Sequence, residues 1–297
     1  MTQNKKNKIQ LGCVGKYKIM VGKKPGGIES EQRIVTDWFP NLITDGGLDI
    51  LATRSFGSAS SYCQVGSGNT TPAFTDSDLA SYVAYVGGTS AYSLDMPLLY
   101  QQCDRTYSFG LGVAAGNLSE IGVGWGTSTN LFSRALILDS EGSPTTITVL
   151  SDEYLTVIYS YRMYGLLADT TGSVTFTGNL AGTYGWTLRH STFDTRLVTQ
   201  DMLYITSTYC YNGPMAIIGS VPSGYSSCGY TSVGYVAGTH TSSMTVTASV
   251  TQGNLSGGIK SIAFYLGTRW QVEFDTPIPK TDQDSLSITF EMTWGRK

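Results

Sequence analysis

The sequence predicts an all-β, mainly antiparallel protein made of two related β-sandwich-like modules. Large apolar residues occupy alternate positions from Leu155 to Met163, which is the period of a strand with one buried face. The chain of 297 residues contains 35 Gly and 19 Tyr, and many Thr and Ser as well, a composition typical of strands joined by tight turns. The tetrapeptide Gly-Asn-Leu-Ser at 116–119 returns at 253–256, each time before a similar series of apolar alternations.

The first copy of this pattern covers residues 116–163. Apolar residues alternate with glycine from Ile121 to Trp125, and the apolar segment 131–138 leads into the turn-like segment 139–144. Together with the strand that ends at Met163, these segments predict four short strands in a β-meander. A further strand is predicted over Arg105–Val113, directly before the pattern.

The second copy follows residue 256 with the same order of elements. Apolar alternations occur at 262–266, 270–274 and 286–294. We therefore expect a basic N-terminal arm at 1–33, a first β-module at 34–165 and a second at 166–297. The first module is expected to contain a short helix near residues 42–52, and the second a long exposed loop at 211–240, rich in Gly, Ser and Tyr.

The N-terminal arm is strongly basic. Its first 24 residues hold seven lysines and no acidic residue, which predicts an electrostatic contact with an acidic neighbour. Lys16–Val21 alternates like a strand, so one hypothesis is that this segment is a strand exchanged with a neighbouring subunit. The alternative hypothesis is that the arm is solvated and disordered. We do not expect nucleic acid as a partner, because Tyr17 is the one aromatic residue interleaved with these lysines and no binding motif is present.

No set of residues carries a catalytic or metal-binding pattern. His190 and His240 have no ligand neighbours at metal-site spacing, and no nucleophile elbow accompanies His190 and its neighbour Asp194. Two acid pairs have the residue types of a glycosidase site but are better explained as turn residues. They are Asp194 with Asp201 and Asp282 with Asp284. We predict no enzymatic activity, no cofactor and no metal.

The five cysteines form no recognisable framework. Their number is odd and their spacing follows no motif, although Cys210 and Cys228 enclose a Gly- and Tyr-rich loop and are one candidate pair for a bridge. No apolar run approaches the roughly 20 residues of a membrane helix, and the basic N-terminus lacks the apolar core of a secretory signal. We expect synthesis in the cytoplasm and no membrane span.

Four segments of the first half form a recognisable set: 41–49 (NLITDGGLD), 64–72 (QVGSGNTTP), 116–125 (GNLSEIGVGW) and 131–137 (LFSRALI). Together they resemble the virion structural proteins of tailed bacteriophages, the tail, tail-tip and fibre-associated family. The resemblance covers about residues 35–165 and implies a non-enzymatic subunit of a symmetric assembly.

The predicted function is a structural subunit of a phage virion, in the tail, neck or fibre-attachment region, made in the bacterial host cytoplasm. A charged fraction of only 14% suits a surface that another chain covers. We expect a homo-oligomer, a trimer or hexamer, which contacts other tail or neck proteins. Alternatives are a receptor-binding adhesin that recognises a host glycan through the loop, a capsid decoration protein and a glycan-degrading enzyme. The candidate subunit contacts are Lys5, Lys6, Lys8, Lys16, Lys18, Arg134, Tyr225, Tyr230 and Tyr235.

Overall fold

The computed structural model describes residues 7–25, 29–95, 97–166, 168–192 and 195–297. Strands dominate the described chain and the helices are few and short, which confirms the predicted all-β class. The chain forms two compact units. Unit 2 contains residues 13–93, 101–163 and 296–297, and unit 1 contains the residues up to Gly12, 94–100 and 164–295.

Unit 2 carries the short helix that the sequence predicts near residues 42–52. The helix begins after Thr44, whose Oγ1 accepts a hydrogen bond from the Gly47 N–H at 2.8 Å and so caps the helix. The elements from the N-terminus to the end of this half are β1 (Asn7–Gly22), η1 (Glu29–Glu31), β2 (Ile34–Val35), β3 (Phe39–Pro40), β4 (Leu42–Ile43), α1 (Asp45–Ile50), α2 (Phe56–Ala59), β5 (Tyr62–Gly66), β6 (Tyr82–Asp95), β7 (Tyr100–Phe109), β8 (Gly116–Leu118), β9 (Glu120–Gly124), β10 (Leu131–Leu136), β11 (Ile147–Val149) and β12 (Tyr154–Tyr164).

Unit 1 contains most of the remaining strands. The predicted loop at 211–240 is wrong in its middle third, where Tyr225–Val233 forms a strand that pairs on both sides. The sequence hides this strand because Ser, Gly and Thr interrupt the apolar alternation. The elements are β13 (Thr170–Phe176), η2 (Gly178–Leu180), β14 (Gly182–Thr192), α3 (Arg196–Thr199), β15 (Thr208–Tyr211), β16 (Tyr225–Val233), β17 (Thr241–Ala248), β18 (Ile259–Leu266), β19 (Thr268–Ile278) and β20 (Leu286–Arg296).

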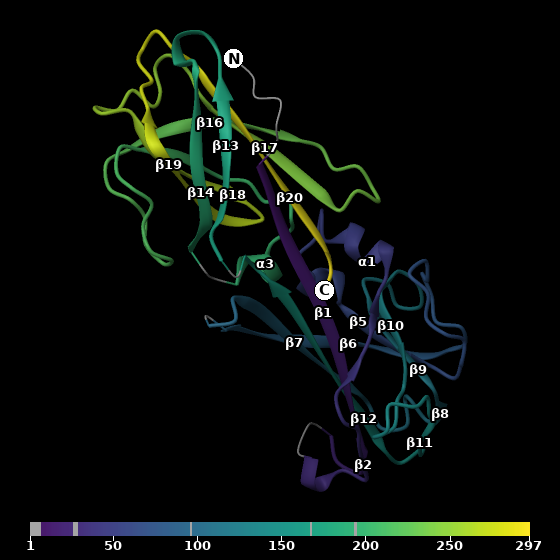
Figure 1. Ribbon diagram of the computed structural model, residues 1–297. Coiled ribbons are helices and arrows are strands. Elements are labelled where there is room, and N and C mark those ends of the chain that lie inside the picture. The colour runs from purple at the N-terminus through teal and green to yellow at the C-terminus, as the bar shows by residue number, and fades with distance from the viewer. Residues whose placement is uncertain (1–6, 26–28, 96, 167, 193–194) are drawn as a thin grey trace. The chain divides into compact units, whose positions relative to one another are not determined.

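The strand pairing of unit 2 follows a simple plan (Figure 1). Strands β9 and β10 form an antiparallel hairpin, with β5 on the outer side of β9 and β4 on the outer side of β10. Strand β6 pairs with β5 and is also a hydrogen-bonded neighbour of β7. Strand β12 pairs with β7 on one side and with β1 on the other.

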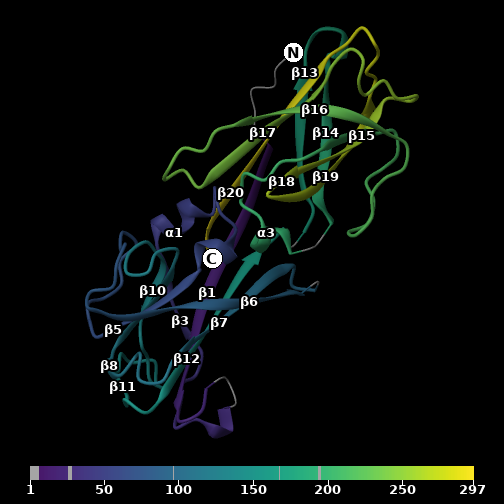
Figure 2. The ribbon, with the colours of Figure 1, turned by 180° about the vertical axis from the view of Figure 1, so that it is seen from behind.

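Unit 1 repeats this plan strand for strand (Figure 2). Strands β18 and β19 form the hairpin, with β15 outside β18 and β14 outside β19. Strand β16 pairs with both β15 and β17, and β20 pairs with β17 and with β1. The seven strands β4, β5, β6, β7, β9, β10 and β12 thus correspond in order to β14, β15, β16, β17, β18, β19 and β20. In both units short helical turns separate the first two strands of the series.

The predicted meander and the tetrapeptide repeat need correction. Only β9 and β10 pair in the expected way; β11 pairs with β8, and β12 pairs with β1 and β7. The first Gly-Asn-Leu-Ser begins strand β8, whereas the second lies in turns, with Gly253 at φ +69°. Similarity between the two halves therefore lies in the order and pairing of strands and not in the tetrapeptide.

Aromatic side chains fill the core of unit 2. Phe56 of α2 stacks on Tyr161 of β12 at 4.0 Å between ring centroids, and Phe132 of β10 meets Tyr161 edge-on at 5.5 Å. The Tyr17 hydroxyl of β1 lies 2.7 Å from the Ser133 Oγ of β10. Because β10 lies near one end of this paired series and β12 and β1 lie at the other, these contacts bring two parts of one curled sheet face to face.

The predicted N-terminal arm is wrong for the described residues 7–22. They form β1, which pairs within the same chain with β2, β3, β12 and β20. Its buried side chains include Ile9, Leu11, Tyr17 and Ile19, so the strand is part of the hydrophobic core. The division between the two units falls inside it, between Gly12 and Cys13. A strand with so much buried apolar surface cannot act as a solvated arm.

Candidate interaction sites

Strand β6 of unit 2 exposes aromatic side chains along its length. Tyr82, Tyr85 and Tyr92 are each between 41% and 44% exposed, and Ala84 is the one buried residue of this strand, all of which is described. No charged residue occurs from Tyr82 to Leu94. An exposed strand with this composition is unusual for the free surface of a protein and is typical of a surface that meets a partner.

The corresponding strand of unit 1, β16, is also exposed and rich in Tyr and Ser. Tyr225 at its start is 66% exposed and Tyr230 is 40% exposed. The sequence predicted both tyrosines as contacts, and the structure places both on the surface. The third predicted tyrosine, Tyr235, lies beyond the strand and stacks on Trp294 at 5.7 Å, so one face of its ring is already occupied.

A groove of about 300 Å³ lies beside the start of β16. Three of its tyrosines approach one another: the Tyr209 and Tyr225 rings meet edge-on at 5.3 Å, and Tyr211 lies 6.4 Å from each. Sequence reasoning attributed binding to the loop 211–240 and missed the residues of β15, β18 and β19. The lining residues are Ser207, Tyr209, Tyr211, Val221, Pro222, Tyr225, Tyr265 and Arg269.

Arg269 supplies the charge of this groove. Its Nη2 lies 3.4 Å from the Tyr211 hydroxyl, and its guanidinium lies 5.6 Å from the centroid of the Tyr265 ring. Within the part of the chain that the structure describes, its Nε is buried without a hydrogen-bond partner and no carboxylate pairs with it. Burial raises the pKa of Tyr211, and Arg269 opposes that rise.

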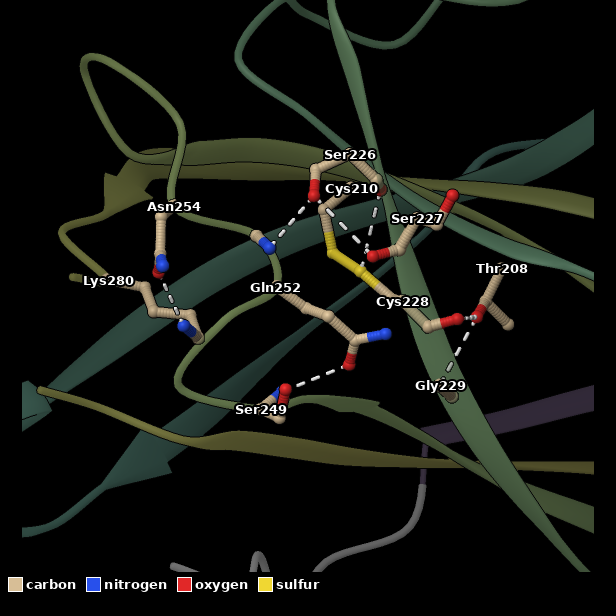
Figure 3. The surroundings of a disulfide bond; sticks show 11 residues. Thr208, Cys210, Ser226, Ser227, Cys228, Gly229, Ser249, Gln252, Asn254 and Lys280 are labelled. Carbon is tan, nitrogen blue, oxygen red and sulfur yellow. Dashed lines mark hydrogen bonds between the residues drawn. A yellow bond between two sulfur atoms is a disulfide. The ribbon is translucent and has the colours of Figure 1, made fainter. Parts of the chain in front are cut away.

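A disulfide joins Cys210 of β15 to Cys228 of β16 (Figure 3). The pair is the candidate that the sequence offered, and its Cα atoms lie 6.4 Å apart. Next to it, the Thr208 Oγ1 donates a hydrogen bond of 2.7 Å to the Cys228 carbonyl. The bridge therefore fixes β15 against β16, the two strands that carry Tyr209, Tyr211 and Tyr225. The other three cysteines, Cys13, Cys63 and Cys103, are buried, and burial raises the pKa of each thiol.

Arg134 does not lie at a surface, contrary to the prediction that made it a subunit contact. The residue is 2% exposed, and its Nη2 and Nε donate to the Glu120 Oε2 at 2.7 and 3.0 Å. Its Nη1 donates to the Asp76 Oδ2 at 2.7 Å. A guanidinium whose donors all point inward offers no surface to a second subunit, so its role is to hold unit 2 together.

The predicted lysine contacts divide into three groups. Lys5 and Lys6 lie outside the described residues. Lys8 is exposed on β1. Lys16 and Lys18 are engaged within the chain, since Lys16 lies 4.4 Å from the centroid of the Trp38 ring and Lys18 pairs with Glu29. Of the described lysines among the candidates, Lys8 therefore has the most exposed side chain.

The residues considered for catalysis are dispersed. His190 is buried against the Trp270 ring at 4.0 Å, and burial lowers its pKa to about 3; its sequence neighbour Asp194 lies outside the described residues. Asp284 accepts hydrogen bonds from the Thr281 N–H and hydroxyl at 3.0 and 2.7 Å, which is a turn contact. No cluster of three His, Cys, Asp or Glu side chains that could hold a metal occurs among the described residues.

Comparisons with known proteins found no relative of this chain. The chain matches no protein-family model, no curated protein and no solved structure at a significant level. In the described part of the chain, every helix is too short or too polar to cross a membrane.

Proposed function

We propose that the chain is a structural subunit of a tailed-phage virion, in the tail, neck or fibre-attachment region, and that it assembles as a homo-oligomer without enzymatic activity. The resemblance of residues 35–165 to virion structural proteins of tailed phages supports the virion assignment. The low charge and the exposed aromatic strand β6 support assembly. Other tail or neck proteins are the expected neighbours.

The observation that carries this proposal is the repeated strand plan of the two units. Three copies of a two-unit chain contain six modules with the same order of strands. Such a trimer suits a junction between a six-fold tail and a three-fold appendage, because each module can make a similar contact while the chain keeps three-fold symmetry.

Strand β6 is the proposed contact between copies. It presents Tyr82, Tyr85 and Tyr92 with no charge between them, so three copies of this neutral surface can meet around a three-fold axis without like charges between them. Tyrosine side chains contribute a large contact area at a small cost in conformational entropy. Only Ala84 of this strand is buried within one chain, and assembly would bury its exposed side chains against neighbouring copies.

The test is the mass of the purified full chain in solution. Light scattering should give three times 32.0 kDa, about 96 kDa. Replacing Tyr82, Tyr85 and Tyr92 together by Ser should give monomers with an unchanged circular dichroism spectrum. The control Tyr230→Ser removes an exposed tyrosine from unit 1 and should leave the trimer intact. A monomeric wild type, or a triple variant that still forms trimers, would contradict assembly through β6.

A further inference from the structure

We propose that the groove lined by Tyr209, Tyr211, Tyr225, Tyr265 and Arg269 is a binding site for an acidic saccharide, one that carries a carboxylate on its sugar ring. The inference goes beyond assembly, because it concerns unit 1 and shares no residue with the β6 contact. Strands β6 and β16 hold the same place in the two units, and the surface beside β16 has become a groove.

The walls of the groove suit a sugar ring. An aromatic face is negative at its centre, and the C–H bonds on one side of a pyranose are weakly positive, so the two surfaces attract and also exclude water. Tyr209, Tyr211 and Tyr225 offer rings 5.3–6.4 Å apart in different orientations. Their hydroxyls and that of Ser207 can both donate and accept hydrogen bonds, as sugar hydroxyls do.

The charge of the groove selects an acid. None of the described residues that line it is acidic, and Arg269 has no carboxylate partner among them. A guanidinium that stacks on an aromatic ring keeps its donors at the ring edge, where a carboxylate accepts two parallel hydrogen bonds.

The groove is also held in shape before a ligand arrives. The disulfide Cys210–Cys228 connects the strand of Tyr209 and Tyr211 to the strand of Tyr225, and the strand pairing from β16 through β15 to β18 extends the support to Tyr265. Rigid walls reduce the entropy lost on binding. The volume of about 300 Å³ is at the lower end of ligand pockets and suits one or two sugar rings better than a folded peptide.

The test is a titration of the full-length protein, monitored by saturation-transfer NMR. The ligands are sodium glucuronate, sodium galacturonate and sodium N-acetylneuraminate, with glucose and galactose as neutral comparisons. At least one acidic sugar should bind with a dissociation constant on the order of 1 mM, and the neutral sugars at least about tenfold more weakly. Arg269→Gln should abolish this preference, with a loss of about tenfold to hundredfold, because a charge-assisted hydrogen bond is removed.

Matched variants separate the groove from the rest of unit 1. Tyr225→Ser should weaken binding of the acidic sugar at least about tenfold, and reduction of the disulfide should weaken it as well. Tyr230→Ser on the same strand and Arg189→Gln, an arginine paired with Asp169 outside the groove, should leave binding unchanged.

Three results would overturn the inference: no acidic sugar binds, the neutral sugars bind equally well, or the Arg189 control loses as much affinity as the Arg269 variant. The β6 variant should bind acidic sugars with unchanged affinity even if it no longer forms trimers. Assembly through β6 and sugar binding in the groove can therefore be refuted separately.

Discussion

The buried charges of unit 2 allow one prediction to be worked out in detail. Arg134 is 2% exposed and its partner Glu120 is 0% exposed. Glu120 also accepts hydrogen bonds from the backbone N–H groups of Gly68, Ala80 and Ser81 at 2.9, 3.0 and 2.7 Å. The pair therefore connects strands β9 and β10 to the loop between β5 and β6. Arg134 also pairs with Asp76, whereas Arg134 is the ionic partner of Glu120 among the described residues.

Replacing Arg134 by Met keeps a long, unbranched side chain and removes the charge. Glu120 then remains buried with backbone donors alone. Breaking a buried pair in this way costs about 3–5 kcal/mol of folding free energy, and the three remaining backbone donors place the expected loss near the lower limit, about 3 kcal/mol. For a unit of this size, that loss lowers the melting temperature by about 6–12 °C.

The assay is urea unfolding of the full chain, followed by tryptophan fluorescence, with thermal melting as a second measurement. The control Lys23→Met removes an ion pair with Asp152 in which both side chains are more than half exposed, at 58% and 65%, and should cost less than about 1 kcal/mol. Adding Glu120→Gln to Arg134→Met should recover part of the loss, because no buried charge is then left unpaired. If the Arg134→Met variant is as stable as the control, or if the substitution reduces the mass of the oligomer without reducing the free energy of unfolding, the structural role of Arg134 is refuted.

Three further predictions concern pH, the disulfide and β1. Burial lowers the pKa of His190 to about 3 in the fold, below its unfolded value of about 6.5. The stability that the neutral imidazole contributes is therefore fully present above pH 6.5, and below it the free energy of unfolding falls by up to about 1.4 kcal/mol per pH unit. His190→Gln should flatten this slope in urea titrations between about pH 6.5 and pH 5, and an unchanged slope would contradict the burial of a neutral imidazole. Replacing Cys210 and Cys228 by Ser should destabilise unit 1 by about 3 kcal/mol through the 18-residue separation that the bridge closes, whereas equal stability of oxidised and serine forms would argue against the bridge. Tyr17→Ala should cost about 3–5 kcal/mol independently of protein concentration; a loss that grows on dilution would indicate that β1 is exchanged between subunits.

Local patterns predicted the parts of the fold that depend on neighbouring residues. The alternation from Leu155 to Met163 became β12, and the short helix predicted near residues 42–52 became α1. The similar order of apolar segments in the two halves became one strand plan in both units. These features are visible in a single sequence because a strand face or a helix cap involves residues a few positions apart.

Features that depend on distant pairing could not be predicted in the same way. The lysines around Tyr17 suggested an arm, but the partners of β1 include β20, more than 260 residues later. Arg134 was assigned to a surface because nothing near it in sequence shows that Asp76 and Glu120 surround it. The groove combines Tyr209, Tyr225 and Arg269, which only the pairing of β15 with β16 and β18 brings together.

The proposed two-unit virion subunit, which would match three-fold to six-fold symmetry, can be tested by a reconstruction of the phage particle by electron cryomicroscopy without imposed symmetry, with this subunit labelled by an antibody. Three copies should surround the tail axis, with the two units of each chain in six similar contacts. A particle that lacks the label, a single copy at each site, or a ring of twelve copies would contradict it.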